Sequence, residues 1–195
     1  MENEHNSSVL AAYTELYGEP SRTLRRSRTG PPPGETAVVV YLPWETQELD
    51  SANDPTLLGT AGFSSESVCA DFPCELGMEI KGRLDEAASG EIATALTDLG
   101  SLPLENDRPY HDGQILTNVS LPPFPRFSMA MLIDWDSVYG FRFPQLEPAV
   151  GLLRVVPLFP AEAELVESYD DRRSGYRDLI NRGMRTPDPD RKPCV

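Results

Sequence analysis

The stretch from residue 151 to residue 180 places the tightest limits on how this chain can fold. It opens with an apolar run, GLLRVV, whose short length and branched side chains indicate a strand buried on both faces. Pro157 lacks a backbone donor, and Pro160 presets φ for a first helical turn. Residues 161–169 are helix formers, and a short amphipathic pattern follows at 176–180. A buried strand that leads directly into helices indicates a sheet covered by helices.

The remaining elements are expected from periodicity and from Gly and Pro punctuation. Residues 101–125 are polar and proline-rich, and a loop of that length is typically functional or poorly ordered. The pattern therefore predicts an α+β fold with a mixed, largely antiparallel sheet covered by helices. Val38, Val40, Leu132, Leu153 and Val155 are expected in one core. The other expected elements are helices at 7–17 and 85–99 and strands at 36–42, 56–63, 76–84, 127–133 and 138–143.

Length and composition predict one domain. A chain of 195 residues can bury a substantial core, and we place the domain at residues 8–183 with flexible termini at 1–7 and 184–195. No apolar run approaches the roughly 18 residues of a membrane span. The first residues, MENEHNSS, are polar and acidic, so they do not form a signal peptide. We therefore expect a cytoplasmic protein with no membrane association.

The net charge of −14 argues against nucleic acid as a partner, because phosphate contacts need clustered Lys and Arg. Such acidity either solvates the surface or presents an acidic face to a basic partner, and the first alternative is favoured. Four arginines do cluster at residues 22–28. We expect them to neutralise the acidic loops of the chain itself.

The three cysteines do not predict a disulfide framework, because their number is odd and no export signal precedes them. Cys69 and Cys74 are close in sequence, and Cys194 lies next to the end. Zinc needs about four ligands, and His5 and His111 are the only histidines. We therefore expect no obligatory disulfide, no metal and no other cofactor.

Two catalytic alternatives remain open beside a non-enzymatic function. Cys69 or Cys74 could act as a nucleophile with His111 as its base, and Asp134 with Asp136 could form a paired carboxylate site. The cysteines carry no known nucleophile signature, and aspartates after a strand more often form a turn. Aromatic residues beside the same break suit a protein contact. The candidate partner-binding residues are Trp135, Asp136, Tyr139 and Phe141.

Several segments, taken in order, resemble the Suppressor of fused-like domain along residues 9–180. LLGTAGFS at 57–64 is similar to its "LVTSGMS" segment, with Ala61 and Phe63 in place of the usual Ser and Met. ELGMEI at 75–80 is similar to its "ELE" strand, and HDGQIL at 111–116 to its "PGHTV" turn. LLRVVPL at 152–158 is similar to its "LQVVPLT" strand. The other matching segments are YTELYGEP at 13–20, VVVYLP at 38–43, IATAL at 92–96 and AEAEL at 161–165.

The resemblance implies a single lobe that binds other proteins and has no catalytic activity. In the animal proteins two lobes close on a transcription-factor peptide, so one lobe cannot reproduce that clamp. Bacterial members of the family are often encoded with toxin systems and are regarded as immunity proteins. The resemblance therefore implies a protein partner, with a cognate toxin as the nearest case. The alternative stays a small enzyme that uses the Cys or Asp residues.

Overall fold

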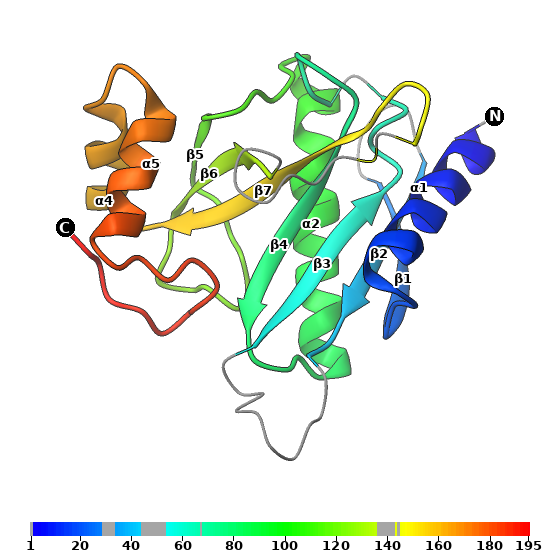
Figure 1. Cartoon of the computed structure of the whole chain (residues 1–195), viewed down its shortest axis with the longest axis horizontal. Helices are drawn as coiled ribbons and strands as arrows, with labels where there is room; N and C mark the ends of the chain where they lie inside the picture. The colour runs from blue at the N-terminus through cyan, green and yellow to red at the C-terminus, as the bar shows by residue number, and fades with distance from the viewer. Residues whose placement is uncertain (1, 29–33, 44–53, 67, 136–142, 144) are drawn as a thin grey trace.

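The strands expected at 36–42, 56–63, 76–84, 127–133 and 151–156 assemble into one sheet, together with strands at 22–27 and 115–117 that the sequence does not predict. The strand expected at 138–143 lies almost wholly outside the described residues. The computed structural model describes every residue except 1, 29–33, 44–53, 67, 136–142 and 144 (Figure 1). The described strands form a seven-stranded sheet of order β1-β2-β3-β4-β7-β6-β5. Neighbouring strands are antiparallel except β4 and β7, so the sheet is mixed and largely antiparallel, as predicted. The strands are β1 Arg22–Ser27, β2 Glu35–Tyr41, β3 Pro55–Ala61, β4 Cys74–Lys81, β5 Ile115–Thr117, β6 Met129–Asp134 and β7 Gly151–Leu158.

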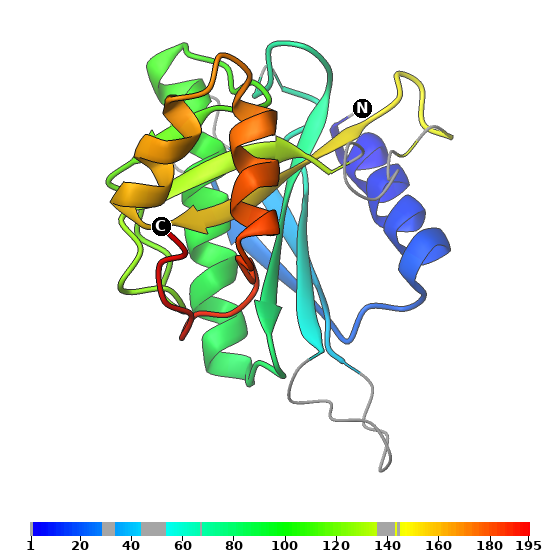
Figure 2. The same cartoon turned by 60° about the vertical axis from the view of Figure 1, so that its left-hand side comes forward.

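Helices cover both faces of the sheet (Figures 1 and 2). Helix α2 packs on one face, where its apolar side contacts alternate residues of β2, β3, β4, β6 and β7. Helix α1 packs on the other face over β2 and β3, and α4 with α5 covers β6 and β7 on that same face. The helices are α1 Glu2–Tyr17, α2 Glu86–Asn106, α4 Pro160–Glu167 and α5 Arg172–Asn181.

The core prediction is confirmed, because all five residues expected to share one core lie in the apolar cluster between α2 and the sheet. Strand β7 is buried along its whole length, as its apolar run indicates. The strand continues through Pro157 instead of ending there. Strand β4 pairs only with the first half of β7, Gly151 to Arg154, so Pro157 lies where β7 has a single neighbour and one missing donor is tolerated.

Helix α2 extends seven residues beyond its predicted end at residue 99. The sequence suggests Gly100 as a helix stop, but Gly100 serves close packing instead. A Cβ atom at this position would lie 2.4 Å from the ring of Phe63, so only glycine fits. The helix ends at Asp107, which has a φ of 51° and donates its N–H to the carbonyl of Pro103.

Both termini make ordered contacts. Helix α1 already begins at Glu2, earlier than the predicted start at residue 7. In the C-terminal tail, residues 184–195, Arg191 is buried and pairs with Glu162, and Asp188 pairs with Lys81. The tail therefore packs on the domain, although the sequence suggests flexible ends at 1–7 and 184–195. The domain limits of 8–183 stay a prediction. Among the described helices, none is both long and apolar enough to cross a membrane.

Candidate functional site: a groove beside an edge strand

A groove of about 930 Å³ runs between helix α2 and the segment that follows it. Helix α2 forms one wall, and β5 with its flanking residues forms the other. Leu102 of α2 is 43% exposed and lies in this groove beside other apolar side chains. Exposed apolar surface in a hollow is typical of a binding site. The larger apolar and aromatic lining residues are Leu99, Leu102, Tyr110, Ile115, Leu116 and Val119.

The groove has an acidic wall and a polar end. Helix α2 contains four acidic residues and no Lys or Arg, and two of the four, Glu91 and Asp98, line the groove. Arg108, just beyond the end of the helix, also lines the groove, as do Asn106, Gln114 and Asn118. A ligand in the groove would therefore meet negative charge along α2.

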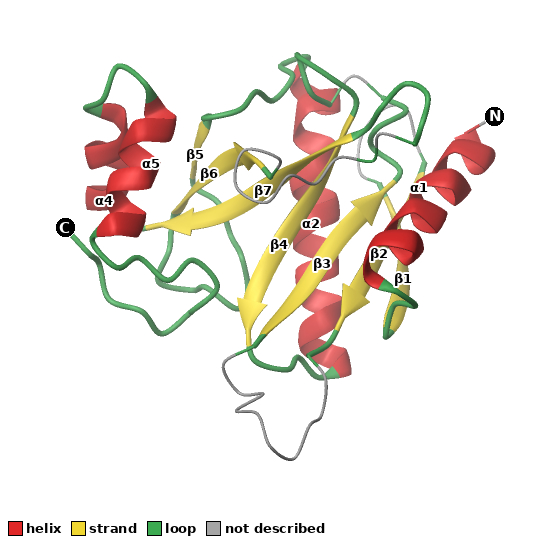
Figure 3. Ribbon diagram, in the orientation of Figure 1, coloured by secondary structure: helices red, strands yellow, loops and turns green. Residues whose placement is uncertain are grey.

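Strand β5 is the last strand of the sheet and has one open edge (Figure 3). Its three residues pair with β6, and the carbonyl of Gln114 accepts the N–H of Leu132 at 2.8 Å. Backbone groups alternate in an antiparallel pair, so the N–H and C=O groups of Ile115 and Thr117 point away from β6. Such an edge is a template for another extended chain. It lies directly beside the apolar groove.

The opposite edge, strand β1, is protected by arginines. Arg22 donates to the carbonyls of Leu84 and Asp85, and Arg26 donates to the carbonyl of Gly90 in α2. Charged residues on an edge strand oppose pairing with another chain. Arg25 also pairs with Glu35 and Arg28 with Glu66, so these arginines have partners within the chain, while their neutralisation of the acidic loops stays a prediction.

Comparison with known proteins identifies the fold. No protein-family model and no curated protein matches the sequence. A solved structure of a suppressor of fused homologue from Neisseria gonorrhoeae superposes with a TM-score of 0.69, over 99% of this chain and 98% of that one, at 12% identity. The chain has the Suppressor of fused fold. A structure described as the Sufu-Fu complex gives a TM-score of 0.61 over 96% of this chain and 91% of that one, at 11% identity.

The Suppressor of fused fold accounts for the motifs that pointed to it. The segment at 57–64 is β3 and the turn after it, ELGMEI opens β4, and the segment at 152–158 is β7. HDGQIL at 111–116 leads into β5 and so reaches the groove wall. The resemblance therefore placed β3, β4 and β7 correctly. The groove itself could not be seen in the sequence, although the long segment 101–125 had been singled out as functional or poorly ordered.

The predicted partner-binding residues fall mostly outside the described part of the chain. Asp136, Tyr139 and Phe141 lie there, so their role stays a prediction. Trp135 is described and is 3% exposed. Its ring lies against Gly77, where a Cβ atom would approach it to 2.7 Å, and the guanidinium of Arg154 lies 5.5 Å from its centroid. In this state Trp135 packs the interior and offers little surface to a partner.

Cys69 and Cys74 are bonded to each other in this structure, and the expectation that no disulfide is obligatory stays a prediction. Their Cα atoms lie 6.0 Å apart, because a tight loop folds Cys69 back against the start of β4. The third cysteine, Cys194, is free. The bonded sulfurs carry no nucleophilic thiol in this state. The ring of His111 contacts the carbonyl of its neighbour Asp112.

The second catalytic candidate is the pair Asp134 and Asp136, of which only Asp134 belongs to the described residues. Its backbone N–H donates to Asp112 at 2.6 Å, and its carboxylate lies 3.7 Å from Arg173. Arg173 also pairs with Asp112. Asp112 and Asp134 thus hold α5 against the end of β6. Among the described residues, no group of three His, Cys, Asp or Glu side chains is arranged to hold a metal ion.

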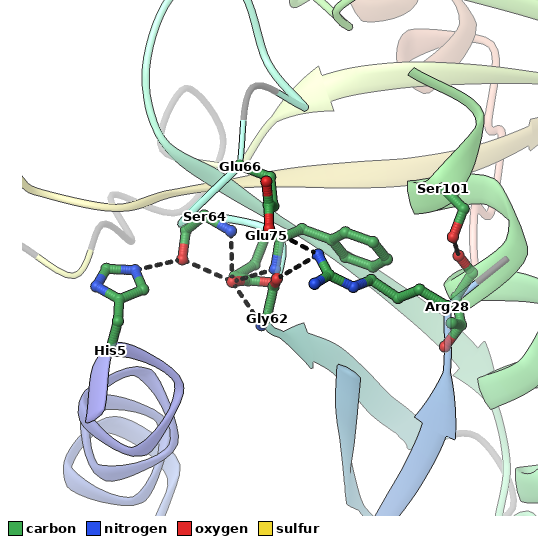
Figure 4. A network of polar contacts seen from close by, with 9 residues as sticks. His5, Arg28, Gly62, Ser64, Glu66, Glu75 and Ser101 are labelled. Atoms are coloured by element: carbon green, nitrogen blue, oxygen red, sulfur yellow. Dashed lines mark hydrogen bonds and ion pairs between the residues drawn. The ribbon is translucent and has the colours of Figure 1, made fainter. Parts of the chain in front are cut away.

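A buried carboxylate organises the turn between β3 and β4 (Figure 4). Glu75 is fully buried and accepts hydrogen bonds from the backbone N–H groups of Gly62, Phe63 and Ser64 at 2.9 to 3.2 Å. The hydroxyls of Thr60 and Ser64 also donate to it, each at 2.7 Å. Burial raises the pKa of Glu75, and these hydrogen bonds oppose that rise. The TAGFS motif and the Glu of ELGMEI are therefore parts of one structural unit.

The same network brings a histidine to a serine. The Nε2 atom of His5 lies 2.9 Å from the Oγ atom of Ser64. This pair does not form a catalytic triad, because Glu75 contacts the serine instead of orienting the histidine. Ser64 donates its proton to Glu75 and is 6% exposed, so His5 cannot serve as its base in this arrangement. Sequence reasoning missed the contact because 59 positions separate the two residues.

Proposed function

We propose that this chain acts by binding a partner protein and holds an extended segment of that partner in the groove between β5 and α2. The observation that carries the proposal is the open edge of β5 beside the apolar groove. Ile115 and Thr117 offer outward backbone groups for strand addition, which supplies affinity. The apolar wall around Leu102 offers a site for alternate side chains of the segment, which supplies selectivity.

The charge of the groove favours a basic segment. Glu91 and Asp98 line the α2 wall, and the whole chain carries a net charge of −14. Complementary charge increases the association rate and disfavours acidic competitors. The arginines of β1 discourage the same mode of binding at the opposite edge. A basic, extended segment is therefore the occupant that the groove suits best.

For the partner itself we propose a cognate toxin, which makes the chain an immunity protein. The sequence resemblance to bacterial Suppressor of fused-like proteins supports this choice. One similar solved structure is described as a complex of Sufu with Fu. Complex formation by that protein supports a binding role here. We further propose a cytoplasmic location, where an immunity protein meets its toxin.

The alternative function is a small enzyme that uses a Cys or Asp site. It requires a thiol from Cys69 or Cys74, which are bonded to each other here, or the aspartates Asp134 and Asp136. Binding and catalysis differ in stoichiometry. A binding protein saturates at a fixed ratio and leaves its partner chemically unchanged, whereas an enzyme alters its substrate when present in substoichiometric amount.

The test is capture of partners from the native cell, followed by titration with purified partner. We expect Leu102→Asp to weaken binding at least about ten-fold, because the charge disrupts the apolar wall. Leu16→Asp is the matched control, since Leu16 is similarly exposed at 39% but lies on α1. Thermal unfolding should show that both variants fold. Equal binding by both variants would exclude the groove, and turnover abolished by Asp134→Asn would favour the enzyme.

A further inference from the structure

The loop that the Cys69–Cys74 disulfide closes has two halves, and each is attached to a different part of the fold. Residues 72–74 belong to the central sheet. The carbonyl of Pro73 accepts the N–H of Gly151 at 2.8 Å, Phe72 packs against the same glycine, and Cys74 begins β4 with 1% exposure. This half is fixed by β4 and β7 whether or not the disulfide is present.

The other half, residues 68–70, is attached to Tyr110. Cys69 and Tyr110 form a β-bridge. Tyr110 donates its N–H to the carbonyl of Val68 and accepts the N–H of Ala70, each at 2.8 Å. The disulfide is thus a second covalent link between this half and the sheet, beside the backbone that runs through Asp71. Without it, residues 68–70 and Tyr110 would be held by that backbone, by these hydrogen bonds and by packing.

Tyr110 is also a wall of the groove. Its ring is buried, its hydroxyl donates to the carbonyl of Leu99 in α2 at 2.7 Å, and it lines the same hollow as Leu102 and Leu116. Its backbone is therefore connected to the cysteine loop, and its side chain is connected to α2. A shift of residues 68–70 would move the groove wall directly.

We propose that the Cys69–Cys74 pair is a redox control of the groove: the disulfide holds Tyr110 in the wall, and reduction loosens it. The inference rests on the proposed function for its biological meaning, but the coupling between the cysteines and Tyr110 does not. In reducing compartments a protein disulfide is usually transient and regulatory. A cytoplasmic chain with this pair would bind its partner according to the redox state.

The exchange chemistry fits the exposure of the two sulfurs. Cys69 is half-buried, whereas Cys74 is fully buried. A thiolate of a dithiol reductant attacks the sulfur of Cys69, and Cys74 leaves as a thiolate that takes up a proton. The second thiol of the reductant then displaces Cys69, which is also protonated. Two protein thiols form, and the reductant is oxidised to its own disulfide.

The third cysteine is not a competing partner. Cys194 lies on the tail, where its thiol donates to Glu162 at 3.3 Å. Burial and the carboxylate of Glu162 raise the pKa of Cys194 to about 11, so little of it is thiolate at neutral pH. Cys194→Ser therefore serves as a control that leaves the proposed exchange intact.

The test is hydrogen exchange of individual backbone amides, which needs no partner. We compare the oxidised protein, the protein in dithiothreitol and the Cys69→Ser/Cys74→Ser variant. In the last two we expect the amides of Ala70 and Tyr110 to exchange at least about ten-fold faster. Amides of α1 should be unchanged, and Cys194→Ser should behave as the wild type in both states. Unchanged exchange at Ala70 and Tyr110 after reduction would overturn the proposal.

A second measurement separates this inference from the proposed function. Peptides are selected from a random library on the oxidised protein, and those that Leu102→Asp fails to bind are kept as probes. We expect reduction of the disulfide to lower the affinity of these peptides at least about ten-fold. Failure to find such peptides would contradict the binding function, while the exchange result would still decide the coupling. Peptides that bind equally in both redox states would refute the redox control alone.

Discussion

Glu75 shows at the residue scale how one side chain can define a turn. It is fully buried, and five donors from residues 60–64 surround its two oxygen atoms. A carboxylate accepts all of them, whereas glutamine presents an NH₂ group where an acceptor is needed. We expect Glu75→Gln to lower the free energy of unfolding by about 1–3 kcal/mol for each donor left unsatisfied.

Chemical denaturation of Glu75→Gln measures this effect. Glu35→Gln is the control, because Glu35 makes an exposed ion pair with Arg25 that is worth about 0–1 kcal/mol. If the two variants are equally stable, the carboxylate of Glu75 does not hold the turn. The sequence contained both parts of this unit, TAGFS and the Glu of ELGMEI, but spacing alone could not show that they meet.

Glu162 makes a second residue-scale prediction, which concerns pH. Its side chain is buried and pairs with Arg191 at 2.5 and 2.7 Å. Burial raises the pKa of Glu162, but the hydrogen bonds and charge of Arg191 outweigh burial and lower the pKa overall. A depressed folded pKa stabilises the protein above the unfolded value of about 4.3, and that stability is lost as the pH falls through the folded pKa.

The measurement is the unfolding free energy of the wild type and Glu162→Gln between pH 7 and pH 3. At pH 7 we expect the variant to be less stable by about 3–5 kcal/mol, because it leaves Arg191 buried and unpaired. The difference should narrow below about pH 4, where the wild type also loses the charge. A difference that is constant with pH would contradict the ion pair.

At the scale of elements, prediction succeeded where the apolar run was long, whereas the arginine-rich strand β1 and the short strand β5 were not predicted. Strand β7 was predicted well because its apolar run is long and fully buried. Strand β5 was missed because three residues cannot display a period, and the segment around them is rich in proline. The end of α2 was misplaced because the sequence does not distinguish a glycine that ends a helix from one, such as Gly100, that permits close packing. The edge strand and groove were therefore invisible to periodicity.

The C-terminal tail gives the element-scale prediction. Its composition, PDPDRKPCV, suggests fraying, yet Arg191 and Asp188 reach Glu162 and Lys81 across the surface. These are contacts over more than 25 positions, which local composition cannot reveal. We expect deletion of residues 184–195 to destabilise the domain by at least about 3 kcal/mol, because the deletion leaves Glu162 without its partner.

The tail deletion is checked by its denaturation midpoint against that of Arg191→Met. This single variant should account for most of the loss, since it removes the same partner of Glu162. A truncated chain as stable as the full one would support the flexible terminus that composition suggests and the domain limit at residue 183.

At the scale of the whole molecule, the net charge of −14 should control how a basic partner approaches. The Debye length shortens from about 30 Å at 0.01 M salt to about 10 Å at 0.1 M, so salt weakens the attraction between the two proteins before they touch. We expect the association rate constant to fall roughly ten-fold across this range, while the dissociation rate changes less. Stopped-flow mixing with the captured partner, or with a basic groove-binding peptide, measures both rates.

The location of the charge can be tested with two charge-matched double variants. Glu91→Gln/Asp98→Asn removes two acids from the groove wall. Glu164→Gln/Asp170→Asn removes two exposed acids from the region of α4, which covers the opposite face of the sheet. The two variants have equal net charge. If steering depends on the groove, only the groove variant should show a weaker salt dependence of the association rate constant. An equal weakening in both variants would attribute steering to the total charge, and an association rate constant that is independent of salt would exclude electrostatic steering.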